Sequence, residues 1–204
     1  MASLAASTAQ ATLVTSHLGT DAAMFALSPT FSFVAEGRIG DRAGAATFEL
    51  DLGQDTGAPF TTAQYGWVSG QVEAFSLTYD ASTHGVTFIL GGRTLNYTAS
   101  GALSDIFIRT RESFAGSSLS VDNLVLNSVA VGDQAGSVGP GLDILRISGA
   151  PLAAGFTLSG NATLSWAGSA PTQSNLAFQI KVGSLPTTPS DATTWGRIRR
   201  LYYR

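Results

Sequence analysis

The alternation of apolar and polar side chains constrains the fold of this chain more than any other feature. Phe75, Leu77 and Tyr79 alternate with serine and threonine, and after a turn Val86 and Phe88 resume the same pattern. A period of two residues is typical of β-strands with one buried face, whereas an amphipathic helix spaces apolar residues three and four positions apart. Helical spacing does not recur convincingly in the sequence. We therefore predict strands throughout and no helices.

Short alternating segments recur along the chain, separated by Gly, Ser, Asn and Asp. They are 31–36, 47–52, 105–110, 119–126, 142–148, 156–166 and 176–182. Within 73–98, a turn before Val86 and a second at Gly91-Gly92 predict a three-stranded meander. About twelve short strands of this kind favour an all-β fold, an antiparallel, jelly-roll-like β-sandwich.

The chain is long enough for one domain. It has 204 residues, of which 44% are hydrophobic, and we predict a single sandwich over 12–183. The strands after the glycine-rich segment 131–141 are too few to bury a core alone. Before the domain, 1–11 is either a flexible segment or a signal-peptide remnant, because Ala9-Gln10-Ala11 has the form of a signal-peptidase site. After it, 184–204 is predicted to be a Pro/Thr linker and a basic C-terminal tail.

Composition excludes several classes of protein. The formal net charge is −3 and 12% of residues are charged, with positive charge clustered only at the C-terminal end, so we expect no nucleic-acid partner. The chain has no cysteine, which excludes disulfides, thiol catalysis and thiolate metal sites. No apolar run approaches the ~20 residues that a membrane-spanning helix needs, so we expect no membrane span.

The best candidate for catalysis is a pair of carboxylates on one predicted strand. Glu49 and Asp51 lie two residues apart and share a face of that strand. The segment resembles the Glu-x-Asp-x-x-Glu strand of laminarinase-like glycoside hydrolases, which act through paired carboxylates. Gly, Gln and Asp follow at 53–55, however, so the third carboxylate is not in place. We favour a solvent face for this pair, with Leu50 and Leu52 inward.

The two histidines give no further support for catalysis. His17 lies near the N-terminal strand and His84 in a turn, and neither has serine and aspartate neighbours in the arrangement of a triad. The sequence also lacks a nucleophile elbow, a P-loop and a dinucleotide-binding fingerprint. We predict that the chain is not an enzyme and has no catalytic residues.

Five aspartates are candidate ligands of a structural calcium ion. They are Asp80, Asp105, Asp122, Asp133 and Asp143. All fall at predicted strand ends or in loops, where carboxylates and carbonyls converge. The same residue type also caps turns, and no EF-hand loop is present. Calcium is the one cofactor that the positions of these aspartates suggest, and they do not define its full ligand set.

Trp67 and Tyr65 form the candidate ligand-binding site. They lie on a short segment flanked by glycine and are expected to be exposed. Trp166 alternates with Leu164 and is predicted to be buried. Aromatic rings pack against the apolar face of a sugar, so the exposed pair predicts a carbohydrate-binding surface.

Three segments carry a resemblance to a known family: AFSLTYDASTHGVTFILGGRTLNYTAS, DIFIRTR and SSLSVDNLVLN. They resemble bacterial exosortase-sorted (PEP-CTERM type) exported surface proteins, which implies a secreted or cell-surface location. The strand at 121–124 is also similar to the closing strand of jelly-roll carbohydrate-binding modules, in which an aspartate holds structural calcium. This similarity implies that Asp122 is a metal ligand. The Pro-Glu-Pro motif and the apolar anchor helix of the exported family do not occur in the sequence.

These patterns together favour a non-enzymatic structural or matrix protein of the cell surface or extracellular space. Its expected partners are other copies of the chain, joined through edge strands or termini, and extracellular polysaccharide. The alternative is a carbohydrate-binding module that uses Trp67 and Tyr65. The remote alternative is a glycoside hydrolase that uses Glu49 and Asp51.

Overall fold

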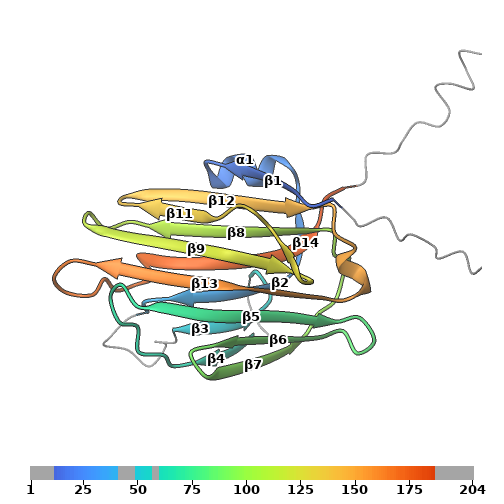
Figure 1. Ribbon diagram of the computed structural model, residues 1–204, viewed down its shortest axis with the longest axis horizontal. Coiled ribbons are helices and arrows are strands. Elements are labelled where there is room, and N and C mark those ends of the chain that lie inside the picture. The colour runs from blue at the N-terminus through green and yellow to red at the C-terminus, as the bar shows by residue number, and fades with distance from the viewer. Residues whose placement is uncertain (1–11, 41–48, 57–59, 187–204) are drawn as a thin grey trace, which may run out of the picture.

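The computed structural model describes residues 12–40, 49–56 and 60–186, and within these ranges the chain forms two antiparallel sheets of seven strands that pack as a sandwich (Figure 1). The predicted all-β, antiparallel, jelly-roll-like sandwich is confirmed. The described residues contain fourteen strands rather than about twelve, because several edge strands are too short to show alternation. The predicted flexible segment at 1–11 and most of the predicted tail at 184–204 lie outside the described residues.

Sheet A has the strand order β1-β12-β8-β14-β2-β3-β4. Its strands are β1 (Val14–Leu18), β12 (Gly141–Ser148), β8 (Asp105–Glu112), β14 (Leu176–Ser184), β2 (Thr30–Arg38), β3 (Leu50–Gly53) and β4 (Phe60–Ala63). Most neighbours in this sheet are far apart in the chain, so long crossover connections build it, as in Greek-key folds.

Sheet B has the order β10-β9-β13-β5-β6-β7, and β11 also pairs with β9. Its strands are β10 (Val129–Ala130), β9 (Ser117–Leu126), β13 (Phe156–Trp166), β5 (Val72–Asp80), β6 (Gly85–Leu90), β7 (Arg93–Thr98) and β11 (Ala135–Val138). A short 3-10 helix, η1 (Leu152–Ala154), precedes β13. β5, β6 and β7 are the predicted meander, with the predicted turns between them.

The core lies between the two sheets. Phe33 and Phe178 from sheet A and Phe88 from sheet B are fully buried. Every second side chain of a strand points to the same face, so the alternation in the sequence becomes one continuous apolar layer. Leu50 and Leu52 point into this layer, which confirms the predicted inner face of their strand.

A short helix, α1 (Asp21–Ala26), lies at one edge of sheet A, beside β1 and β12 (Figure 1). Thr20 caps it by accepting a hydrogen bond from the first turn at 3.1 Å. Met24 is fully buried against Phe107 and Ile144, which face away from the main core. The prediction of no helices is wrong here, because six residues are too few to show a helical stripe. Within the described ranges, no helix has the length and apolarity to cross a bilayer.

The glycine-rich segment 131–141 does not separate two sheets. It contains β11, which pairs with β9, and the strands that follow it join strands that precede it in both sheets. β12 pairs with β8, β13 with β5 and β9, and β14 with β2 and β8. Strands from before and after this segment therefore share one core.

The difference between core and surface isoleucines predicts a difference in stability. Ile108 is fully buried between the sheets, whereas Ile89 is 42% exposed. We expect Ile108→Ala to lower the free energy of unfolding by about 2–5 kcal/mol, through lost burial and the cavity left behind. The matched variant Ile89→Ala should lose less than about 1 kcal/mol. Urea denaturation measures both, and equal losses would contradict the assigned inner face of β8.

Candidate functional site

The N-terminal strand β1 covers one edge of sheet A. It pairs antiparallel with β12, from Val14 opposite Ser148 to Leu18 opposite Ile144. β12 has the burial of an interior strand, because Ile144 and Leu145 are fully buried. β1 is more exposed, and its Val14 side chain is 56% exposed. The strand therefore shields the edge of β12 while burying little surface of its own.

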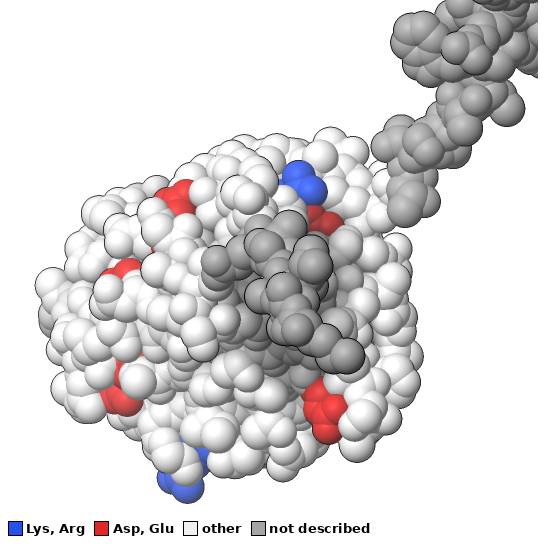
Figure 2. All heavy atoms as spheres, turned by 45° about the vertical axis from the view of Figure 1, so that its right-hand side comes forward, with Lys and Arg blue, Asp and Glu red and all other residues white. Residues whose placement is uncertain are grey.

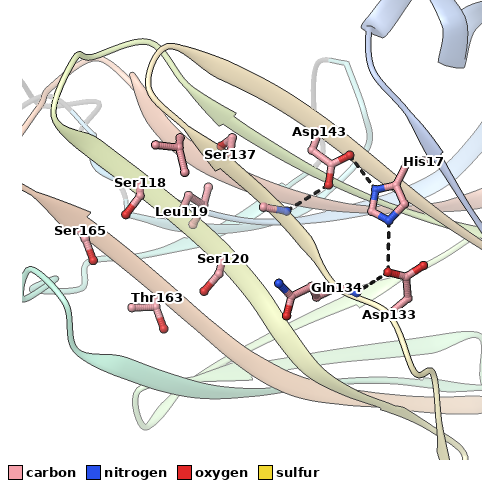
Figure 3. A pocket seen from close by; sticks show the side chains of 12 residues that line it. His17, Ser118, Leu119, Ser120, Asp133, Gln134, Ser137, Asp143, Thr163 and Ser165 are labelled. Carbon is pink, nitrogen blue, oxygen red and sulfur yellow. Dashed lines mark hydrogen bonds and ion pairs between the residues drawn. The ribbon is translucent and has the colours of Figure 1, made fainter.

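Two carboxylates hold β1 through the ring of His17 (Figure 3). His17 Nδ1 lies 2.8 Å from Asp143 Oδ1, and Nε2 lies 3.2 Å from Asp133 Oδ1. Asp143 belongs to β12, and Asp133 lies between β10 and β11. Backbone amides hold both carboxylates in place, with Gly136 N donating to Asp143 and Gln134 N donating to Asp133. We call His17, Asp133 and Asp143 the β1 latch.

The latch changes the pKa values of its members. The hydrogen bond to Asp143 and then that to Asp133 raise the pKa of His17 above 6.5. The hydrogen bonds from His17 and Thr15 lower the pKa of Asp133 below 3.8. A protonated imidazole donates from both nitrogens, so it satisfies both carboxylates at once. The latch is therefore an ion pair when His17 carries its proton.

An open hollow of about 570 Å³ lies beside the latch. Its wall on sheet B carries a row of hydroxyls from β9 and β13: Ser118, Ser120, Thr163 and Ser165. In Figure 3 these side chains lie to the left of the latch, on two neighbouring strands. The lining contains acceptors and donors but no lysine or arginine among the described residues. Such a surface suits a neutral, hydroxyl-rich ligand better than an anion.

The histidine contacts do not form a nucleophile–base pair. Both ring nitrogens of His17 face carboxylates, and His84 Nδ1 lies 2.9 Å from the Tyr79 hydroxyl. Neither set of contacts includes a serine hydroxyl, the nucleophile of a Ser-His-Asp triad. The absence of a catalytic role stays a prediction.

Trp67 and Tyr65 are partly buried rather than fully exposed, and both pack against the core. Their rings meet edge to face, with centroids 4.9 Å apart and planes at 82°. Trp67 Nε1 donates a hydrogen bond of 2.9 Å to the Arg38 carbonyl. The pair forms a corner and not the flat surface on which a sugar ring stacks. Trp166, predicted to be buried, is also only partly buried.

The five candidate calcium ligands do not converge on one point. Asp122 accepts hydrogen bonds from Ser120 and Asn123, Asp80 caps a turn at Ser82, and Asp105 pairs with Arg146. Asp133 and Asp143 do come together, but His17 lies between them. Among the described residues, no group of three or more histidine, aspartate or glutamate side chains has a metal-binding arrangement. Calcium at Asp122 stays a prediction.

Glu49 and Asp51 have different surroundings. Glu49 accepts a hydrogen bond of 2.9 Å from Gly40 N and lines a pocket with Trp67. Asp51 lies opposite Glu36 of β2 in the sheet, on the outer face. Burial, and then the charge of Glu36, raises the pKa of Asp51 to about 7. Glu36 was not identified from the sequence as the partner of Asp51. A glutamate inside a largely apolar strand segment was the available signal of a charged site.

Comparison with known proteins gives no family for this chain. No protein-family model matches the sequence, and no curated protein matches it significantly. Neither comparison therefore assigns a function to the β1 latch or to the pockets.

The raised pKa of Asp51 predicts a pH-dependent stability. In the folded chain Asp51 keeps its proton up to about pH 7, whereas its ordinary pKa is 3.8. Its favourable contribution is therefore complete below about pH 4 and is lost as the pH rises through 7. We expect Asp51→Asn to raise the free energy of unfolding at pH 8 by roughly 1–3 kcal/mol and to change little at pH 4.

Urea denaturation at the two pH values measures this effect. Asp80→Asn is the control, because hydrogen bonds from the side chain and the backbone of Ser82 lower the pKa of Asp80 below 3.8. That variant should lose stability at pH 8. A loss of stability for Asp51→Asn at pH 8 would instead show that the nearby Arg38 outweighs burial.

The latch predicts a pH window for the docking of β1. The His17 contribution is complete below pH 6.5 and is lost as the pH rises through the raised pKa, whereas the Asp133 contribution is lost as the pH falls below 3.8. Protection of the β1 amides from hydrogen exchange, relative to those of β8, should fall a few-fold from pH 5.5 to 8.5. The effect is modest because the His17 side chain is 46% exposed. His17→Gln should remove the pH dependence, and an unchanged dependence would contradict the latch.

Proposed function

We propose that this chain is a non-enzymatic structural protein of an extracellular matrix or cell surface, and that its copies assemble by exchanging strand β1. In the exchanged form, β1 of one copy pairs with β12 of the next. The observation that carries the proposal is that β1 is the outermost strand of sheet A and is largely exposed, whereas its neighbour β12 has buried side chains. A vacated β12 edge would expose unpaired backbone groups, and such an edge recruits another strand.

The register of β1 on β12 supports exchange between identical copies. A second copy carries the same residues 14–18, so it can re-form all five residue pairs with β12. It also brings its own His17 to Asp133 and Asp143. Exchange of an identical element keeps the contacts of the closed form, which makes it a low-cost route to assembly.

The connection between β1 and α1 supplies a hinge. α1 is anchored, because Asp21 pairs with Arg109 at 2.6 and 2.7 Å and Met24 is fully buried. Gly19 lies between the two elements, and nothing occupies the space around its Cα where a Cβ would stand. In the exchanged form we expect β1 to turn away at Gly19, while Thr20 keeps its place as the cap of α1.

The chain carries little charge overall, with a formal net charge of −3 and 12% charged residues. On the face shown in Figure 2, charged side chains of the described residues are few, and at one place a positive and a negative group lie next to each other. Weak surface charge reduces repulsion between identical molecules. The extracellular location is supported by the resemblance of 75–127 to exported bacterial surface proteins.

An engineered disulfide tests the exchange. Val14 and Ser148 are directly opposite each other, at a Cα separation of about 4.5–5.5 Å that suits a disulfide. The chain has no cysteine, so Val14→Cys/Ser148→Cys introduces the only thiols. After concentration and oxidation, we expect disulfide-linked dimers and higher species on a non-reducing gel. Light scattering of the unmodified chain should show growth of mass with concentration.

Two controls make the result specific. Thr78→Cys/Thr157→Cys joins opposite residues of neighbouring strands in sheet B and should give monomers under all conditions. Oxidation of the first variant at high dilution should lock β1 in its own copy and prevent assembly. Exclusively intramolecular disulfides at high concentration would overturn the proposal.

Carbohydrate binding is the second candidate function, and the hollow beside the latch favours it. Uncharged hydroxyls of β9 and β13 line that hollow, together with the Gln134 amide. These groups are able to exchange hydrogen bonds with a polyhydroxylated ligand. Retention of the chain on insoluble polysaccharide distinguishes this candidate from assembly.

A further inference from the structure

A small pocket lined by aromatic residues lies between the end of β13 and the segment that joins β4 to β5. Its volume is about 130 Å³. Its lining residues are Ile39, Glu49, Tyr65, Gly66, Trp67, Trp166 and Ala170, and we call it the aromatic pocket. An apolar cavity of about 150 Å³ holds a molecule the size of benzene. The aromatic pocket thus accommodates a compact group of similar size.

The aromatic walls meet at an angle. The planes of Tyr65 and Trp67 are at 82°, with ring centroids 4.9 Å apart, and Trp166 contributes a third ring to the lining. Tyr65 and Trp67 touch each other, and a group in the pocket meets their rings together with that of Trp166.

Contacts behind the rings hold the walls in place. Trp67 donates to the Arg38 carbonyl, and its ring lies edge to face with Phe178 of the core. Tyr65 packs directly over Gly91, where any Cβ would collide with the ring. Ser69 bonds both the backbone nitrogen and the backbone oxygen of Trp166 at 2.8 Å. A pocket with fixed walls loses little entropy when a ligand enters.

Among the described residues, the charged side chains at the pocket are carboxylates. The Glu49 carboxylate belongs to its lining. Glu73 is buried beside the Tyr65 hydroxyl; burial and the hydrogen bond to Glu73 raise the pKa of Tyr65 to about 12. No lysine or arginine is among the described lining residues. Arg38 contributes a backbone carbonyl nearby, while its side chain pairs with Glu36 and Asp51.

We propose that the aromatic pocket binds a quaternary ammonium group, the trimethylammonium cation found on choline-type compounds. The faces of tryptophan and tyrosine attract cations, and quaternary ammonium groups are recognised in this way. The methyl groups spread the charge and need no hydrogen-bond acceptors, so contact with aromatic rings suits them. The Glu49 carboxylate adds a countercharge at the wall. This inference is independent of strand exchange.

Tryptophan fluorescence tests the proposal directly. Trp67 and Trp166 line the pocket, and Trp195→Phe removes the third tryptophan of the chain from the signal. The probes are tetramethylammonium chloride and choline. The control is 3,3-dimethylbutan-1-ol, which has the shape of choline without the charge. We expect saturable quenching by both cations and at least about tenfold weaker binding of the neutral analogue.

Variants separate the pocket from the rest of the surface. Trp67→Ala should weaken tetramethylammonium binding about tenfold, and Glu49→Gln should weaken it roughly threefold. Glu49→Gln keeps the rings, so it stays informative if Trp67→Ala fails to fold. Asp122→Asn is the control, because it removes a carboxylate outside the pocket and should leave binding unchanged.

The outcomes are decisive in both directions. Equal binding of the neutral analogue, or the absence of saturable binding of tetramethylammonium, would overturn the proposal. Once binding is measured, sedimentation with phosphatidylcholine vesicles identifies the source of the group. Co-sedimentation that excess tetramethylammonium abolishes indicates a lipid headgroup, and no co-sedimentation indicates a soluble ligand.

Discussion

The pairing of β14 between β8 and β2 is the contact on which the rest of the sandwich depends. β14 is the last described strand, yet it lies at the centre of sheet A and joins strands from two earlier parts of the chain. Its side chains Phe178, Ile180 and Val182 are fully buried. Without β14, sheet A would divide into two parts, and the inner face of sheet B would lose much of its cover.

The same strand links the core to the aromatic pocket. The ring of Phe178 packs against Phe75 of sheet B and lies edge to face with Trp67. Gly37 on the neighbouring strand leaves room for both rings, because a Cβ at this position would collide with Phe178. The walls of the pocket therefore depend on the packing of the core, which explains why Trp67 and Tyr65 are partly buried.

The edge strand β1 of sheet A is held by different interactions from those of the core strands. β1 is held by backbone pairing and by the His17 contacts more than by burial, so we expect its docking to depend on the protonation of His17. Sequence and structure agree well on the strands that carry strong alternation, such as β5 and β6, and on the inward leucines of β3. They differ at β1, β4, β10 and β11, because short edge strands have only one partner and leave a weak pattern.

By itself, the sequence determined the longer strands and the buried face of strands with clear alternation, such as β3, β5 and β6, because alternation is a local property of the chain. It did not determine which charged residues meet. Asp51 lies opposite Glu36, and His17 reaches Asp133 and Asp143, which are 116 and 126 residues away. Only the tertiary structure decided these contacts, because strand order and register across a sheet depend on packing between distant segments.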